Sequence, residues 1–445
     1  MYNFPKGFYT DIRIETIYST KIVLDNYKLK QNNSKTETGA IIRLFDGNRW
    51  YYSSTTEIEN IQSEIDSLSQ MAKVNDDIEN NPIVKKLEIN KGSYLKYKDC
   101  NISKVSNKDK INILNSYVPT LKNFKEIQNC KLYYLDNHTE KHIISSKGTD
   151  VIFDIQTCSI CPRYTVNVKN EPFNGGTDIS GTTFTELFNK EYLIVNEIKK
   201  DIDYISNATA VTPGNYTCIL SPVATGVFAH ESFGHKSESD FMVGDETMKK
   251  EWVLGKKVGA NILNIIDTGS IEGAGYVPFD DEGTKCQKNY IIKDGILTGR
   301  LHSSTTATIL EEELTGNARA LNFLYEPLVR MTTTFIDKGS ETKESLFKKI
   351  KEGIFIDTIR HGSGMTTFTI APARAYMIRD GKISEPVKIS VITGNVMSTL
   401  NKIDGISDKV ELFSFALGGC GKMEQYPLKV GLGGPYIRVN EINVQ

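Results

Sequence analysis

Residues 230–235 read HESFGH, and this hexapeptide constrains the chain more than any other segment. Ser221 and Pro222 ahead of it predict a helix start, because serine caps a helix and proline suits its first turn. Residues 223–229 are small and apolar, which indicates that the helix is buried. Burying two imidazoles and a carboxylate at its end costs free energy unless these groups have partners. A metal ion would be such a partner.

The spacing of the two histidines adds a second constraint. His230 and His235 are five residues apart, so a regular α-helix would point them about 140° apart. One ion can bind both rings only if the helix widens into a π-turn or ends between them. Gly234 lowers the cost of such a distortion, so we expect an irregular or terminating helix there. A regular helix through His235 would instead indicate two ordinary histidines, one buried and one exposed.

A catalytic zinc site needs one more protein ligand than this segment supplies. Such sites use three protein ligands and leave one position open for water. Cys420 lies between glycines that would let its backbone approach a crowded site, and its thiolate is a soft ligand. Composition does not choose among the candidates for the third ligand, which are Glu238, Asp240, His361 and Cys420.

Length and composition describe a globular protein of two or three domains. The chain has 445 residues, 39% apolar and 24% charged, and a net charge of -2, which excludes the basic surface of a typical nucleic-acid binder. Its seven cysteines are odd in number and scattered, which argues against a disulfide framework. The start lacks the apolar run of a secretory signal, and no stretch approaches about 18 apolar residues. We therefore expect a cytoplasmic protein.

The N-terminal part, residues 1–210, is predicted to be an α+β domain. Asp46-Gly47 indicates a hairpin between two strands. Thr56 and Glu59 have capping-box spacing ahead of a helix with one apolar stripe. In a later helix we expect Phe188 and Tyr192 on the buried side. In full, the predicted helices of this part are 56–71, 106–118 and 185–205, and further strands are predicted at 131–135 and 151–168.

Residues 211–445 are predicted to form a β-rich domain. A turn cluster at 212–215 marks the boundary between the two domains. Asp294-Gly295 and Asp380-Gly381 lie between apolar runs and indicate hairpins. The glycines at 431–434 suggest a turn, because the context of a phosphate-binding loop is missing. The few helices expected in this part are 222–235, 304–313 and 342–352.

Several segments together resemble the TldD/PmbA family of metallopeptidases. Their order and spacing agree with the family across residues 222–439, and the N-terminal half agrees more weakly. Val329 stands where the family has proline, and Thr333 where asparagine is common. The segments that carry the resemblance are 230–241 (HExxxH and its acidic continuation), 279–283 (DDEG), 289–299, 325–332 and 419–422 (CGK).

The resemblance implies a complete set of site residues and an activity. One Zn²⁺ per chain would be held by His230, His235 and Cys420, and Glu231 would be the general base. The substrates would be peptides or unfolded protein segments. The family forms dimers, either of like chains or of an active and a metal-free subunit, and the intact HExxxH block indicates the active type here. Its fold is a helix-on-sheet domain followed by a β-rich domain.

Candidate substrate contacts lie in two further segments. The glycines of residues 360–366 would let an extended peptide pair with a strand edge, unless this flexible loop between strands is a plain turn. His361 is a candidate for stabilising the oxyanion, with a surface loop histidine as the alternative. The acidic run 280–282 would line the cleft or form a solvated turn. The residues in question are His361, Gly362, Ser363, Gly364 and Asp281.

Two other functions remain open on the sequence alone. A zinc amidase acting on a small substrate would have a small, closed cavity. A silent peptide-binding or scaffold subunit would have a structural metal with a fourth protein ligand. Two histidines and a cysteine suit zinc, although another divalent ion is not excluded. Cys158 and Cys161 are interpreted as strand packing, and Lys422 as a hydrogen-bonding lysine.

Overall fold

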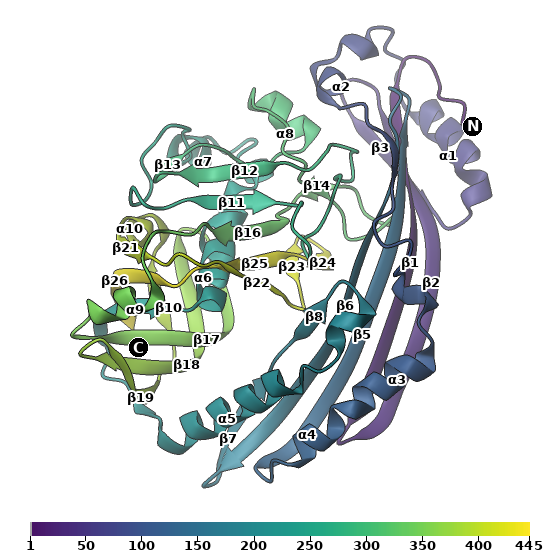
Figure 1. Cartoon of the computed structure of the whole chain (residues 1–445). Helices are drawn as coiled ribbons and strands as arrows, with labels where there is room; N and C mark the ends of the chain where they lie inside the picture. Colours follow the sequence, from purple (N-terminus) through teal and green to yellow (C-terminus); the bar gives the residue numbers. More distant parts are fainter. Residues whose placement is uncertain (1) are drawn as a thin grey trace.

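A tall, curved sheet, antiparallel except for the parallel pair β4–β6, forms one side of the molecule (Figure 1). The computed structural model describes residues 2–445. Buried and less buried side chains alternate along β5, as expected of a strand. Ile12 in β1 lies opposite both Ile42 and Ile144. In space the strands follow the order β3-β2-β1-β5-β6-β4, with β7 and β8 paired to β6. Their bounds are β1 Tyr9–Asp25, β2 Lys28–Phe45, β3 Trp50–Thr55, β4 Lys91–Tyr94, β5 Ile127–Ser145, β6 Asp150–Val168, β7 Glu171–Gly176 and β8 Ile179–Gly181.

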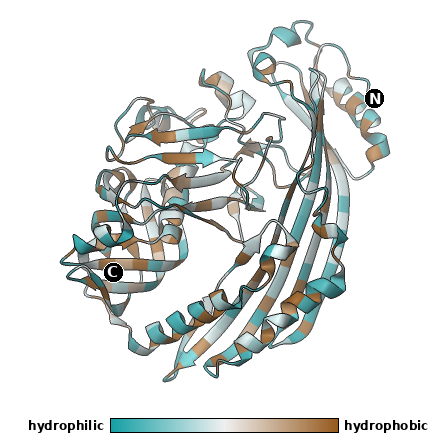
Figure 2. Cartoon of the chain, viewed as in Figure 1, coloured by the Kyte–Doolittle hydropathy of each residue, from teal (hydrophilic) through white to brown (hydrophobic). Residues whose placement is uncertain are grey.

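Helices pack on both ends of this sheet. α1 buries Ile61, Ile65 and Leu68 with the residues of β1 and β2, as its apolar stripe predicts. At the other end, α5 buries Ile194 and Ile198 together with side chains of β5 and β6. Figure 2 shows apolar residues in bands along α5. The bounds are α1 Ile61–Met71, α2 Pro82–Lys86, α3 Asn107–Ser116, α4 Val118–Lys122 and α5 Glu191–Asn207.

Two details predicted for these helices are wrong. Thr56 and Glu59 do not cap α1, because a 3-10 turn at Ile58–Asn60 intervenes and α1 has no side-chain cap. Phe188 and Tyr192 are 45% and 55% exposed. α5 begins only at Glu191, and Tyr192 lies two residues before the buried Ile194, about 200° round the helix from it.

The rest of the chain is rich in strands, which gives the molecule an α+β fold. One sheet has the order β17-β10-β26-β20-β18-β19-β9, with β21 on β26, and the other β13-β12-β11-β16-β25-β22. Two short hairpins, β14–β15 and β23–β24, complete it. The strand bounds are β9 Thr209–Ala210, β10 Gly214–Leu220, β11 Ile265–Thr268, β12 Lys288–Lys293, β13 Ile296–Leu297, β14 Ala318–Arg319, β15 Leu328–Val329, β16 Thr333–Ile336, β17 Glu352–Gly364, β18 Thr367–Arg379, β19 Lys382–Lys388, β20 Ile392–Asn395, β21 Ile403–Ile406, β22 Glu411–Ser414, β23 Cys420–Lys422, β24 Gln425–Leu428, β25 Gly431–Gly434 and β26 Ile437–Val444.

α6 (Pro222–Ala229) runs through the middle of this β-rich part (Figure 1). It packs on β25, β17 and β16. A Cβ atom at Gly226 would lie 2.4 Å from the backbone nitrogen of Gly433, so only glycine allows this approach. The glycines at 431–434 therefore form a strand against α6, and the predicted turn is wrong. The remaining helices are α7 Glu246–Glu251, α8 Ser304–Ile309, α9 Lys343–Lys348 and α10 Val396–Asn401.

Three predicted hairpins are confirmed. Asp46-Gly47, Asp294-Gly295 and Asp380-Gly381 each join paired antiparallel strands. All three glycines have positive φ, the backbone conformation for which glycine is suited. The domain boundary at residue 210 stays a prediction. β9, at Thr209–Ala210, lies before that boundary but pairs with β19 of the β-rich part. Within residues 2–445, no helix is both long and apolar enough to cross a membrane.

A buried ion-pair network holds the acidic turn of the β-rich part against the long sheet. Asp281 Oδ1 lies 2.6 Å from Lys141 Nζ, and Asp281 Oδ2 lies 3.6 Å from Arg13 Nη1. Burial raises the pKa of Asp281, but Arg13 and Lys141 outweigh it, and the pKa falls below its usual value. Glu282 pairs with Arg43 at 3.1 Å. These contacts fix the relative position of the two parts.

Replacing Asp281 by asparagine should destabilise the fold by about 3 kcal/mol, because it leaves buried cations without their counter-charge. Urea unfolding followed by tryptophan fluorescence would measure the loss. Lys35→Ala is the matched control: its partner is Glu37, both side chains are largely exposed, and removing such a pair changes stability by less than about 1 kcal/mol. An Asp281 variant that is as stable as the control would contradict a stabilising role of this ion-pair network.

Candidate metal centre and cleft

The helix that carries the two histidines is distorted where the sequence predicts it. Ser221 Oγ accepts a hydrogen bond from Ala224 N and caps α6. α6 ends at Ala229, a π-helical turn covers residues 230–234, and a 3-10 turn follows at His235–Ser237. A Cβ at Gly234 would lie 2.1 Å from Met331 Sδ, so glycine also makes room for a packed neighbour. The π-turn allows both histidine rings to face one point.

His230, His235 and Cys420 come together at the end of α6. One ligand atom from each lies within 4.8 Å of the others. Cys420 Sγ is 3.5 Å from His235 Nε2, and the two imidazole centroids are 5.0 Å apart. Cys420 begins β23, and its carbonyl accepts a hydrogen bond from Arg330 Nη2 at 2.8 Å. Of the four candidates for the third ligand, only Cys420 lies in this group.

The other three candidates lie outside this group. Glu238 is fully buried, and its Oε2 contacts His235 Nδ1 at 3.3 Å, on the far side of the ring from Cys420. Asp240 Oδ1 accepts from Lys422 Nζ at 2.6 Å. His361 is exposed on β17. Among residues 2–445, the group therefore contains three potential ligands from His, Cys, Asp and Glu.

The electrostatics of the three residues favour a thiolate. Burial raises the pKa of Cys420, but hydrogen bonds and charges from His230 and His235 outweigh it and lower the pKa to about 5. Burial lowers the pKa of His235, while Cys420 and Glu238 raise it to about 10. His230 Nδ1 is buried without a hydrogen-bond partner. Two imidazoles, one of which has an unpartnered buried nitrogen, and one thiolate are a donor set that fits zinc.

Glu231 faces a hairpin that approaches it closely. Residues 360–364 are not a flexible loop as expected, because they pair with β18 as part of β17. A Cβ at Gly362 would lie 3.4 Å from Glu231 Cγ, and one at Gly364 would lie 3.0 Å from the Glu231 carbonyl oxygen. The glycines therefore allow β17 to run beside the turn that carries Glu231.

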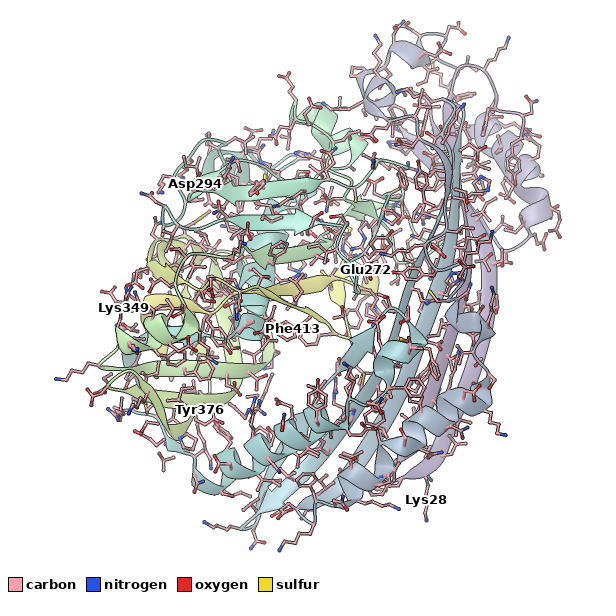
Figure 3. All side chains as sticks on the ribbon, in the orientation of Figure 1. Lys28, Glu272, Asp294, Lys349, Tyr376 and Phe413 are labelled. Atoms are coloured by element: carbon pink, nitrogen blue, oxygen red, sulfur yellow. The ribbon has the colours of Figure 1, made fainter. Side chains whose placement is uncertain are left out.

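A cleft of about 1050 Å³ lies between the long sheet and the β-rich part. His230, Glu231 and Cys420 line it, and so do His361 and Gly362, whereas Ser363 and Gly364 do not. A second hollow of about 920 Å³ adjoins it, because the two share part of their lining. Phe413, labelled in Figure 3, lines the second hollow. The residues common to both are Gly176, Thr177, Asp178, Glu197, Thr358, Arg374 and Phe415.

Asp281 is not among the residues that line either hollow, and its role in substrate binding stays a prediction. Its carboxylate is buried and pairs with Arg13 and Lys141, so it is not part of a solvated turn. Cys158 and Cys161 are buried free thiols on β6, which agrees with strand packing.

Sequence reasoning missed the role of Arg374 beside the cleft. Its guanidinium pairs with Glu197 and Asp201 of α5 and, at 2.8 Å, with Asp357 of β17. These contacts tie the helix of the N-terminal part to the wall that carries His361. No local sequence motif predicts these ion pairs, because Arg374 and its partners on α5 are distant in sequence.

The chain is similar to several known proteins in sequence and in fold. Residues 213–445 match the family model for the PmbA/TldA metallopeptidase C-terminal domain, and residues 10–73 match the model for domain 1. A metalloprotease of Methanocaldococcus jannaschii is 32% identical over 97% of this chain and 96% of its own length. A zinc metalloprotease TldD homolog of Saccharolobus solfataricus is 28% identical over 98% and 96%. The crystal structure of TldE from Thermococcus kodakarensis has the same fold, with a TM-score of 0.78 at 16% identity over 98% of this chain and 96% of that one.

In metal-free protein, Cys420 should react with iodoacetamide as a thiolate in mildly acidic solution. Its pKa is lowered to about 5, and the thiolate is the reactive form. The alkylation rate should therefore be nearly constant from neutral pH down to about pH 6 and fall as the pH drops through about 5. Mass spectrometry of the modified peptide would follow it, with Cys420→Ser as the control for other cysteines. A rate that keeps rising from pH 7 to about pH 9 would contradict the imidazole–thiolate arrangement.

Proposed function

This chain belongs to the TldD/PmbA family of metallopeptidases, and we propose that it is a zinc-dependent peptidase that hydrolyses peptides or unfolded protein segments. The observation that carries the proposal is the convergence of His230, His235 and Cys420 within 4.8 Å, with His230 and Cys420 on the wall of a large cleft. The relatives named metalloproteases support a metal-dependent hydrolase, and one of them is named a zinc enzyme.

His230, His235 and Cys420 would hold one zinc ion per chain. When bound, zinc acts as a Lewis acid and makes a water molecule nucleophilic near neutral pH. Three protein ligands leave a coordination position for substrate or water, which is the pattern of catalytic sites. Within residues 2–445 no fourth His, Cys, Asp or Glu joins the group, which supports an enzyme over a scaffold with a structural metal.

Glu231 is proposed as the general base. It follows His230 directly, is partly exposed, and lines the cleft, whereas the neighbouring Glu238 is fully buried behind His235. The Glu231 carboxylate would take a proton from the attacking water and return it to the nitrogen of the leaving amine. His361 lines the same cleft and is proposed as a donor to the oxygen of the scissile carbonyl.

The edge of β17 is proposed to bind the substrate backbone. β10 pairs with β17 only at Ile354–Ile356. Beyond that point, within the described residues, β17 pairs with β18 alone, so its other edge is open. Thr358–Gly362 on this stretch line the cleft beside Glu231, where an extended peptide would add as a further strand. The size of the cleft and the adjoining hollow favour such a chain over the small substrate of an amidase.

Two parts of the proposal concern assembly and place. The family resemblance supports a dimer, either with a like chain or with a related metal-free subunit. The HExxxH block of this chain supports the active role in such a pair. We also propose a cytoplasmic location, which is supported by the seven free cysteines and the reducing environment that such usage suits.

Glu231→Gln should keep its zinc and lose about 10²- to 10⁴-fold of its peptidase activity, because a general base contributes that much. Elemental analysis and cleavage of an unfolded protein substrate would measure the two effects. Glu246→Gln on the exposed face of α7 is the matched control.

Cys420→Ser should lose zinc. If the Cys420 variant binds a full equivalent of zinc, Cys420 is not a zinc ligand. If Glu231→Gln keeps full peptidase activity, Glu231 is not the general base.

Substrate length and backbone should decide between a peptidase and an amidase. Unstructured peptides of increasing length should be cleaved with rising kcat/KM, while small amides should be poor substrates. Methylating two amide nitrogens of a good peptide should lower its affinity by about 30-fold, since each of the two lost hydrogen bonds contributes about 1 kcal/mol net. A small amide cleaved as fast as a long peptide would favour the amidase.

A further inference from the structure

Glu238 lies where it can control the orientation of a candidate ligand. It follows the 3-10 turn of His235 and is fully buried. Its Oε2 lies 3.3 Å from His235 Nδ1, while His235 Nε2 faces Cys420 Sγ at 3.5 Å. A carboxylate that accepts a hydrogen bond from Nδ1 fixes the imidazole tautomer in which Nε2 is free to bind a metal.

Lys422 joins this carboxylate to the strand that carries Cys420. Its Nζ donates to Glu238 Oε2 at 3.1 Å, to Asp240 Oδ1 at 2.6 Å and to the carbonyl of Val329 at 2.9 Å. All three ammonium hydrogens are thereby used, and the side chain is 3% exposed. Lys422 contacts the backbone carbonyl of Val329, which any residue provides. The contact is therefore compatible with valine at a position where the family has proline.

A role in stability alone does not account for this pair. Removing two charges from water costs several kcal/mol, and well-packed apolar side chains often stabilise a fold as well as a buried ion pair does. The pair does, however, join the turn of His235 to β23, two segments that are 185 residues apart at their ligand positions. It therefore sets the distance between two ligands.

We propose that Glu238 and Lys422 are positioning residues that hold His235 Nε2 and Cys420 Sγ in a ligating arrangement. Lys422 also neutralises Glu238 and keeps its carboxylate directed at His235 rather than at the ion. This inference rests on the proposed metal-dependent function. It assigns no catalytic step to either residue, since each acts through another side chain.

The test is zinc affinity, measured by competition with a chromophoric chelator on metal-free protein. Glu238→Ala and Lys422→Met should bind zinc about 10- to 100-fold more weakly, the usual effect of losing a partner of a metal ligand. Glu238→Gln keeps an oxygen that accepts from His235 Nδ1 and should recover most of the affinity. Lys110→Met is the matched control, because Lys110 forms an equally buried pair with Asp136 in the long sheet.

The absorption spectrum of the cobalt(II) protein gives a second readout that is independent of activity. Wild type should show a thiolate-to-cobalt charge-transfer band, and Glu238→Ala should show altered ligand-field bands. If Lys422→Met does not fold, the double variant Glu238→Leu/Lys422→Met removes both charges together. It should fold and still bind zinc weakly.

The outcomes separate this inference from the proposed function. Wild-type protein that binds no zinc would overturn both. Wild type that binds zinc tightly, with Glu238→Ala and the double variant unchanged in affinity and cobalt spectrum, would overturn the positioning role alone. An equal loss of affinity in Lys110→Met would also overturn it, since the effect would then be one of general stability.

Discussion

Two imidazoles five residues apart meet one thiolate only because α6 gives up its regular hydrogen bonding at His230. The π-turn at 230–234 turns His235 towards Cys420, and Met331 packs where a side chain at Gly234 would stand. This turn is buried against β17 and β16, so the surrounding core maintains a geometry that an isolated helix would not adopt. The candidate metal centre is therefore a product of tertiary packing.

The cleft depends on how the two parts of the chain are joined. The buried pairs of Asp281 and Glu282 fix the β-rich part to the long sheet at one end, and Arg374 ties α5 to β17 at the other. Between these contacts lies the cleft of about 1050 Å³. The charged residues near the cleft thus shape it, while Glu231 and His361 remain on its wall.

The sequence predicts features that depend on neighbours along the chain. The distortion at Gly234 follows from helix geometry, and the Asp-Gly hairpins follow from turn chemistry. Features that depend on partners distant in the chain are not predicted by the sequence. Asp281 looks like a solvated or cleft residue until Arg13 and Lys141 are placed beside it, and residue patterns alone left the third ligand open among four side chains. The family resemblance, rather than local spacing, singled out Cys420.

The buried charges around the centre explain why these particular residues occur together. With both imidazoles neutral, the negative groups beside the centre are the thiolate of Cys420 and the carboxylates of Glu238 and Asp240. Lys422 contacts both carboxylates, and the guanidinium of Arg330 contacts the Cys420 carbonyl. In metal-free protein Cys420 and Glu238 raise the pKa of His235 to about 10, so its imidazole carries a positive charge near neutral pH. A third neutral imidazole in place of Cys420 would leave the bound cation with excess positive charge in a buried setting, where uncompensated charge is costly. The thiolate and the Glu238–Lys422 pair are therefore parts of one electrostatic arrangement.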